Sequence, residues 1–182
     1  FDGTEWKTVD VGTYESLEYI WLANAGELAF GTLDRVFTRG LGAGEDAPSP
    51  DGWANRGKLT PPSGASSIVT AAWGRTGSNM MWVATSTEVW RIGADGATLT
   101  PTAGVPKSVC SNLPCKWLRA LDGVSPNVVW GVGETGSAIR ITGADGASPT
   151  VEVMNPLTWS VLNGVWAVSD TEAWAVGARG LV

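Results

Sequence analysis

The closing stretch "LNGVWAVSDTEAWAVGARGLV" (Leu162–Val182) contains the triplet Trp-Ala-Val twice, first at Trp166 and again at Trp174. Each triplet lies in a run of aromatic, β-branched and small residues, a composition that favours β-strands. The polar residues from Ser169 to Glu172 separate the two runs and are typical of a turn. The stretch therefore predicts a hairpin of two antiparallel strands.

The same pattern occurs three more times in the chain. It is present in "LEYIWLANAGELAFG" (Leu17–Gly31), "VTAAWGRTGSNMMWVAT" (Val69–Thr85) and "LRALDGVSPNVVWGVG" (Leu118–Gly133). Successive copies are 44 to 54 residues apart, a period typical of repeat proteins and propellers. In chain order, the first apolar runs end at Trp21, Trp73, Asp122 and Trp166, and the second runs contain Leu28, Trp82, Trp130 and Trp174.

Further strand signals complete each repeat. The runs "RVFTR", "EVWRIGADG" and "SAIRITGADG" follow the first three hairpins, and Asp-Gly pairs at 51–52, 95–96 and 145–146 predict tight turns into a fourth strand. We therefore expect an all-β fold, a β-propeller built of four-stranded antiparallel blades. It would form one domain over residues 1–182, with repeats at 13–59, 60–103, 104–155 and 156–182 plus 1–12.

The fourth repeat is incomplete within residues 156–182, so we expect the N-terminus to supply its missing part. Phe1, Asp2 and Gly3 resemble the end of a third strand and its turn, and Trp6–Val9 resembles a fourth strand. A last blade shared between the two termini would close the ring and remove the open sheet edge. Joining the two termini directly would leave fewer residues for the third strand than the third repeat has. Excision from a longer protein therefore stays an alternative.

These Val-Trp-(Ala/Gly)-Val-Gly units and Asp-Gly turns resemble those of bacterial Trp-rich β-propeller repeat proteins, many of which are predicted cell-surface lipoproteins. Residues 162–177 and 124–140 carry the resemblance best. More distantly, the chain resembles the Asp-box repeats of sialidase-like propellers and the propeller factor that assists photosystem II assembly. The resemblance implies a fold rather than one function, because propellers host binding, scaffolding and catalysis alike.

Composition excludes several classes of protein. The 182 residues are 43% hydrophobic and 16% charged, which is too apolar for a disordered chain. No apolar run approaches the roughly 20 residues needed to cross a bilayer, so we expect no membrane span. A lipid anchor outside this segment remains an alternative. The net charge of −6, without a basic cluster, argues against a nucleic-acid partner.

The cysteines and the absence of histidine bear on location and chemistry. Cys110 and Cys115 flank Pro114 in "CSNLPC", a spacing that suits a small disulfide loop in a secreted, cell-surface or periplasmic protein; two free thiols are the alternative. With no His and no second Cys pair, we expect no zinc site. We expect no other metal site and no cofactor; a calcium ion held by Glu45, Asp46 and Asp51 is the alternative. The absence of His also excludes Ser-His-Asp and Cys-His catalysis.

Residues that break the repeat are the candidates for binding, because the recurring Trp residues are expected to fill the spaces between blades. Asp122 stands where other repeats have Trp, either as a buried acid in a site or as a turn residue beside Gly123. Three positions before each first anchor the residue is polar and differs between repeats. These residues are Glu18, Thr70, Arg119 and Asn163, and we expect their side chains to line one mouth of the central channel. They would either bind a ligand there, with an ion pair between Glu18 and Arg119, or simply be solvated.

Two insertions, Gly40–Trp53 and Pro101–Trp117, each end in a Trp outside the repeated positions. Loops on a rigid scaffold often carry recognition, so Trp53 and Trp117 are candidate contact residues. The alternative is that each Trp caps its own blade.

We therefore expect a non-catalytic extracellular binding or scaffold module that recognises a protein or a glycan through its channel mouth and these two loops. A carbohydrate-active propeller that uses Glu18 and Asp122 is one alternative, because glycoside hydrolysis needs only two suitably spaced carboxylates. Another alternative is a fragment of a larger propeller or assembly, which would associate with other propeller segments and have no activity alone.

Overall fold

The computed structural model describes residues 3–22, 28–31, 35–40, 47–59, 68–75, 81–86, 89–92, 99–101, 117–146, 148–155 and 158–182. In these residues the regular structure is β-strand, with two short 3-10 turns, η2 (Glu134–Gly136) and η3 (Ala178–Gly180), and no α-helix. The expectation of an all-β fold is therefore confirmed. Glu45, Asp46, Cys110, Cys115 and the expected turn at 95–96 lie outside the described residues.

The strands form four antiparallel sheets that follow one another along the chain. The first sheet contains β1 (Tyr19–Leu22), β2 (Leu28–Gly31), β3 (Arg35–Thr38) and β4 (Ala54–Lys58). The second contains β5 (Val69–Gly74), β6 (Met81–Thr85), β7 (Val89–Ile92) and β8 (Leu99–Pro101). The third contains β9 (Leu118–Ser125), β10 (Val128–Gly133), β11 (Ala138–Thr142) and β12 (Thr150–Met154), and the last contains β13 (Leu162–Ala167) and β14 (Ala173–Gly177).

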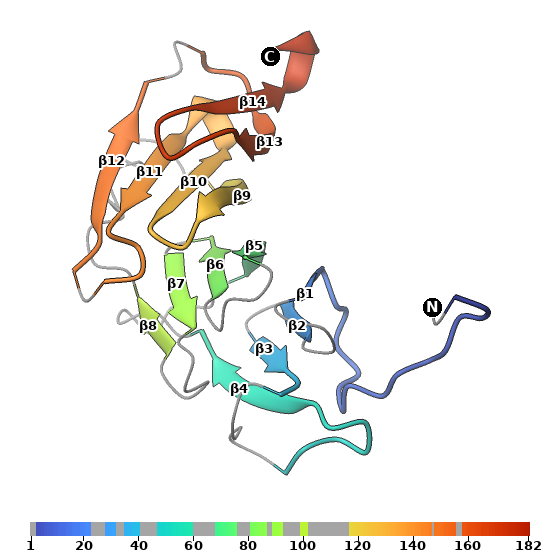
Figure 1. Ribbon diagram of the computed structural model, residues 1–182. Helices are drawn as coiled ribbons and strands as arrows, with labels where there is room; N and C mark the ends of the chain where they lie inside the picture. Colours follow the sequence, from blue (N-terminus) through green and yellow to red (C-terminus); the bar gives the residue numbers. More distant parts are fainter. Residues whose placement is uncertain are drawn as a thin grey trace.

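The sheets pack against one another through their first strands. β1 contacts β5, β5 contacts β9, and β9 contacts β13. Figure 1 shows the sheets along an open arc, with these first strands on its concave side and β4, β8 and β12 on its convex side. The described sheets thus have a propeller-like arrangement in the form of an arc.

Tryptophans of the repeat fill the spaces between neighbouring sheets. Trp82 is buried against Leu118 and Ile139 of the third sheet, and Trp130 is buried against Ala167 of the last sheet. Such large apolar side chains dominate the energy of packing in a core. For Trp82 and Trp130, the expected space-filling role is confirmed.

Two of the expected Asp-Gly turns lie within the described residues, and both are formed. Gly52 has φ of +80°, and its N–H donates to the Ser49 carbonyl at 2.8 Å, directly before β4. The N–H of Gly146 donates to the Gly143 carbonyl at 2.9 Å, ahead of β12. Each turn therefore leads from a third strand toward a fourth, as the sequence predicts.

The N-terminal segment does not complete the last sheet. Residues 3–18 contain no strand, β13 and β14 form a two-stranded sheet, and Figure 1 shows the two ends of the chain apart. The expectation that Trp6–Val9 closes the ring is therefore wrong in this structure.

Contacts with the first sheet explain where the N-terminal segment lies. The Asp10 N–H donates to the Asp51 carboxylate at 2.6 Å, and the Ser49 hydroxyl donates to the Asp10 carbonyl at 2.8 Å. Val11 packs beside Phe37 in the same region. These contacts hold the segment at the opposite end of the arc from β14.

Candidate functional site

The last sheet has one covered face and one exposed face. Ala167 lies on the covered face, against Trp130 of the third sheet. Because side chains alternate along a strand, Trp166, Trp174 and Val176 lie on the other face, where 70%, 54% and 49% of each residue is exposed. Trp166 and Trp174 are partners in the register of β13 and β14, so their indoles are neighbours on one surface.

We call this surface the terminal face. It surrounds a hollow of about 400 Å³ whose lining is almost wholly apolar and consists of Gly164, Val165, Trp166, Trp174, Val176 and Val182. Hollows of this size are large enough for a ligand or for side chains of a partner. Contiguous exposed apolar surface on a folded protein marks an interaction site.

The exposure of the terminal face follows from its place in the arc. Trp82 is covered by the third sheet, and Trp130 is covered by the last sheet, where its indole N–H donates to the Ser169 carbonyl at 3.3 Å. Trp174 occupies the same position in its own hairpin, but no sheet of the described part of the chain lies over it. The expectation that every recurring Trp fills an inter-sheet space is therefore wrong for Trp166 and Trp174.

Asp122 attaches the last sheet to the third sheet. Its Oδ2 accepts a hydrogen bond from the Ala167 N–H at 2.7 Å, across the boundary between β9 and β13. Nearby, the Ser125 hydroxyl donates to the Asp170 carboxylate at 2.8 Å. Asp122 lies within a strand and not in a turn, and its hydrogen bond helps to hold the hairpin that presents the terminal face.

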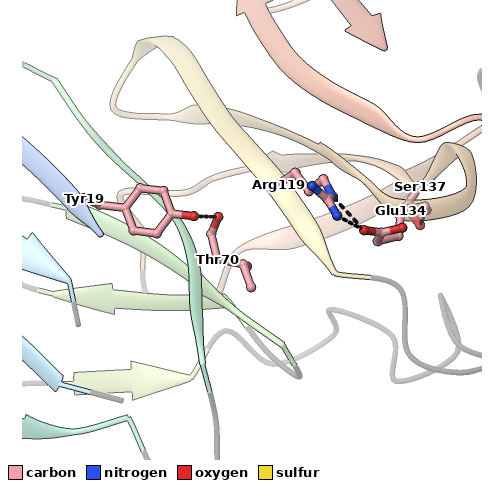
Figure 2. Close-up of polar contacts among 5 residues, drawn as sticks. All are labelled: Tyr19, Thr70, Arg119, Glu134 and Ser137. Carbon is pink, nitrogen blue, oxygen red and sulfur yellow. Dashed lines mark hydrogen bonds and ion pairs between the residues drawn. The ribbon is translucent and has the colours of Figure 1, made fainter. Parts of the chain in front are cut away.

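The residues expected at the channel mouth have different environments. Glu18 and Asn163 are exposed, and Thr70 is buried. Arg119 forms an ion pair with Glu134, with its Nε 2.6 Å from a carboxylate oxygen, as Figure 2 shows. In the described residues the Glu18–Arg119 pair is not formed, because the turn after β10 brings Glu134 next to Arg119 within one sheet.

Tyr19 joins the first two sheets close to these charges. Its hydroxyl donates to the Thr70 carbonyl, and Figure 2 shows the ring extending from the first sheet toward the second. Burial raises the pKa of the phenol, the charge of Glu18 raises it further, and the charge of Arg119 acts in the opposite direction. Glu18 and Arg119 thus both act on the Tyr19 phenol through their charges, although the two do not form an ion pair with each other.

The two loop tryptophans differ in accessibility. Trp53 is only 1% exposed and packs with Val11 and Phe37, and the Arg39 guanidinium lies 5.3 Å from its ring centre. Trp53 therefore caps its own sheet and is not positioned to contact a partner, which corrects the expected contact role. Trp117 is 40% exposed directly before β9 and stays accessible.

The described residues hold no further candidate of two other kinds. In that part of the chain, no three His, Cys, Asp or Glu residues gather as metal ligands would. None of its helical segments has the length and apolar character to span a membrane.

Comparison with known proteins supports the fold. No family model and no curated protein matches the sequence. The chain is similar to the solved structure of YCF48 bound to D1 peptide, with a TM-score of 0.55 and 9% sequence identity. The match covers 97% of this chain and 65% of that one, so the chain spans less than two thirds of the length of YCF48 in that structure. At this identity the likeness concerns the fold alone, which is all-β and propeller-like.

Proposed function

We propose that this chain is a protein-binding module of propeller-like fold, and that its terminal face holds an apolar segment of a partner protein. The observation that supports the proposal most is the exposed cross-strand pair of Trp166 and Trp174. YCF48, whose fold is similar, has been solved with a D1 peptide bound, which is consistent with a role of this kind.

The apolar surface of this face can supply part of the energy that specific binding needs. Covering the exposed parts of two indoles removes on the order of 200 Å² of apolar surface from water, which is worth about 5 kcal/mol before the costs of association. Trp residues at the centre of an interface are also the commonest energetic anchors. Micromolar binding corresponds to about −8 kcal/mol net, so a partner would have to bury further surface beyond the two indoles to reach it.

The lining favours a peptide over a glycan. Apart from the two indole N–H groups, the side chains of the terminal face carry no hydrogen-bonding group. A sugar exposes hydroxyls that need such partners, whereas an apolar peptide side chain does not. The expected alternative of catalysis by Glu18 and Asp122 gains no support here, because the Asp122 carboxylate is engaged by the Ala167 N–H and Glu18 precedes the first sheet whereas Asp122 lies in the third.

The proposed place of action is outside the cytoplasm, at the cell surface or in the periplasm. This part of the proposal rests on the spacing of Cys110 and Cys115 in the sequence. Mass spectrometry after thiol alkylation of the natural protein, with and without reductant, tests it. Two alkylated thiols without reductant would contradict a disulfide.

The binding proposal is tested with short extended peptides displayed as a library, screened against the chain and against a Trp166→Ser, Trp174→Ser variant. We expect the chain to select apolar peptides and the variant to bind none of them. An Arg119→Ala, Asn163→Ala variant is the matched control, because it changes the expected channel mouth and leaves the terminal face intact. If only the Arg119→Ala, Asn163→Ala variant failed to select peptides, the binding site would lie at the expected channel mouth. A chain that binds glycans but no peptide would overturn the proposal.

A further inference from the structure

The first strands of the last three sheets each contain a β-bulge at the same position of the repeat. In the pairing of β9 with β10, Leu118 and Ala120 oppose successive residues of β10, so Arg119 is the extra residue. The pairings of β5 with β6 and of β13 with β14 pass over one residue of the first strand in the same way, and these residues are Thr70 and Asn163. A bulge re-aims the side chain of its extra residue, and bulges are common next to active sites. The polar residues expected at the channel mouth are therefore presented by a repeated backbone feature.

Of the three bulges, one is closed and two are open to solvent. Thr70 is buried, and its carbonyl accepts the hydrogen bond from Tyr19, whose ring extends from the first sheet (Figure 2). Arg119 and Asn163 are exposed, and their strands, β9 and β13, contact each other on the concave side of the arc (Figure 1). Arg119 is exposed although a further sheet lies beside its own, so its accessibility does not depend on where the arc of sheets ends.

Glu134 connects Arg119 to an exposed tryptophan. The Glu134 carboxylate forms the ion pair with Arg119 (Figure 2), and the Glu134 backbone N–H donates to the Trp117 carbonyl at 2.9 Å. Leu118 is buried, whereas Trp117 and Arg119 on either side of it are exposed. An indole, a guanidinium and a carboxylate are thus gathered at the start of β9. We call Trp117, Arg119, Glu134 and Asn163 the concave rim.

These groups suit a ligand that has both hydroxyls and an apolar face. The Arg119–Glu134 pair offers planar donors and acceptors in a fixed arrangement, which two adjacent hydroxyls can meet together. The Asn163 amide adds a donor and an acceptor from the neighbouring strand, and the Trp117 indole offers an apolar surface. An anionic ligand would meet the like charge of Glu134 beside the guanidinium, which disfavours it.

From these observations we infer that the concave rim is a binding site for a neutral saccharide. The ring hydroxyls bind the Arg119–Glu134 pair and the Asn163 amide, and the C–H face of the sugar packs on Trp117. This site is separate from the terminal face, and the inference does not depend on the proposed function.

The whole chain is screened against immobilised neutral oligosaccharides of glucose, mannose, xylose and N-acetylglucosamine, beside oligogalacturonate, and the best ligand is titrated by calorimetry. We expect the chain to select a neutral oligosaccharide. Arg119→Ala and Trp117→Ala should each weaken its binding about tenfold or more. The matched control is Trp6→Ala, which removes an exposed indole of the N-terminal segment and should bind as the parent does.

Glu134→Gln provides a readout that a merely structural role would not change. The glutamine oxygen still accepts from the guanidinium, but the charge of Arg119 is no longer compensated. We therefore expect this variant to gain binding of oligogalacturonate relative to the parent. Unchanged selectivity would show that the ion pair does not face the ligand and would overturn the inference.

The remaining outcomes separate this inference from the proposed function. A chain that binds no neutral oligosaccharide, or binds it equally well as Arg119→Ala, would overturn the inference, and the proposed function would stand if apolar peptides were still selected. The Trp166→Ser, Trp174→Ser variant should lose the peptides and keep the saccharide. If it lost the saccharide instead, the sugar site would lie on the terminal face and the inference would be wrong.

Discussion

The Asp122 carboxylate accepts a hydrogen bond from the backbone N–H of Ala167 and so joins the third sheet to the last one. In the second sheet the equivalent residue is Trp73, whose ring lies so close to Gly123 that a Cβ there would overlap it. The same position of the repeat thus joins neighbouring sheets by apolar packing in one case and by a hydrogen bond in the other. Asp122 is a structural substitute for Trp at this position.

Asp122→Ala should lower the free energy of unfolding by about 1 to 3 kcal/mol, because it leaves the buried Ala167 N–H without its acceptor. Asp122→Asn keeps an oxygen acceptor and should lose less. Urea denaturation of the three proteins measures both effects. Equal stabilities for the Ala variant and the parent would show that the hydrogen bond contributes nothing.

Two glycines in equivalent turns form a matched pair for a second prediction. Gly136 and Gly180 have φ of +70° and +72°, so alanine is strained at either position. A Cβ at Gly136 would also overlap the Thr158 carbonyl, whereas a Cβ at Gly180 would meet nothing within 4 Å. Gly180→Ala should therefore cost about 1 to 2 kcal/mol, and Gly136→Ala clearly more.

Chemical denaturation of the two glycine variants separates backbone strain from overlap, since only the overlap differs between them. Similar losses at both sites would mean that the Thr158 carbonyl moves aside at little cost. A larger loss at Gly180 would contradict the prediction.

Local patterns in the sequence were sufficient for the four repeated hairpins and the described turns. The hairpin of residues 162–177 follows from two apolar runs and a polar turn, and Trp166 and Trp174 are register partners as that pattern indicates. The first repeat is less regular. Leu28 is the partner of Leu22 and not of Trp21, so the pairing there is displaced by one residue from the equivalent pairs of the other sheets. A one-residue change of register is beyond what an apolar pattern alone determines.

The accessibility of each repeated residue could not be predicted, because it depends on neighbouring sheets rather than on the local sequence. Trp130 and Trp174 have the same local surroundings in the sequence, yet one is buried and the other exposed. The N-terminal segment shows the same limit. Trp6–Val9 has the composition of a strand, but hydrogen bonds between Asp10 and the loop before β4 place the segment at the first sheet.

Tyr19 makes a third prediction, for alkaline pH. Its pKa lies above the ordinary value of 10.0, chiefly because of burial. Below that value the phenol is protonated in the folded and the unfolded chain. Between the ordinary and the raised pKa the unfolded chain releases the proton first, so stability falls as the pH rises through this window.

A tyrosinate absorbance titration should therefore contain a late phase, which Tyr19→Phe removes and Tyr14→Phe keeps. Tyr19→Phe should also flatten the alkaline loss of stability, although its stability at neutral pH is lower because the hydrogen bond to the Thr70 carbonyl is lost. A late phase that persists in Tyr19→Phe would refute the assignment.

The two loop tryptophans provide the last prediction. Trp53 is enclosed by Val11, Phe37 and the Arg39 guanidinium, so Trp53→Ala leaves a large cavity and should cost about 3 to 5 kcal/mol. Trp117→Ala removes a side chain that is partly in water already, and we expect it to cost about 1 kcal/mol or less. Urea denaturation compares the two variants, and Trp53→Phe, which keeps an aromatic ring in the space, should recover part of the loss. Equal stabilities of Trp53→Ala and Trp117→Ala would contradict the prediction. The packing of the N-terminal segment on the first sheet would then not contribute to folding. The placement of that segment away from β14 would lose its physical basis.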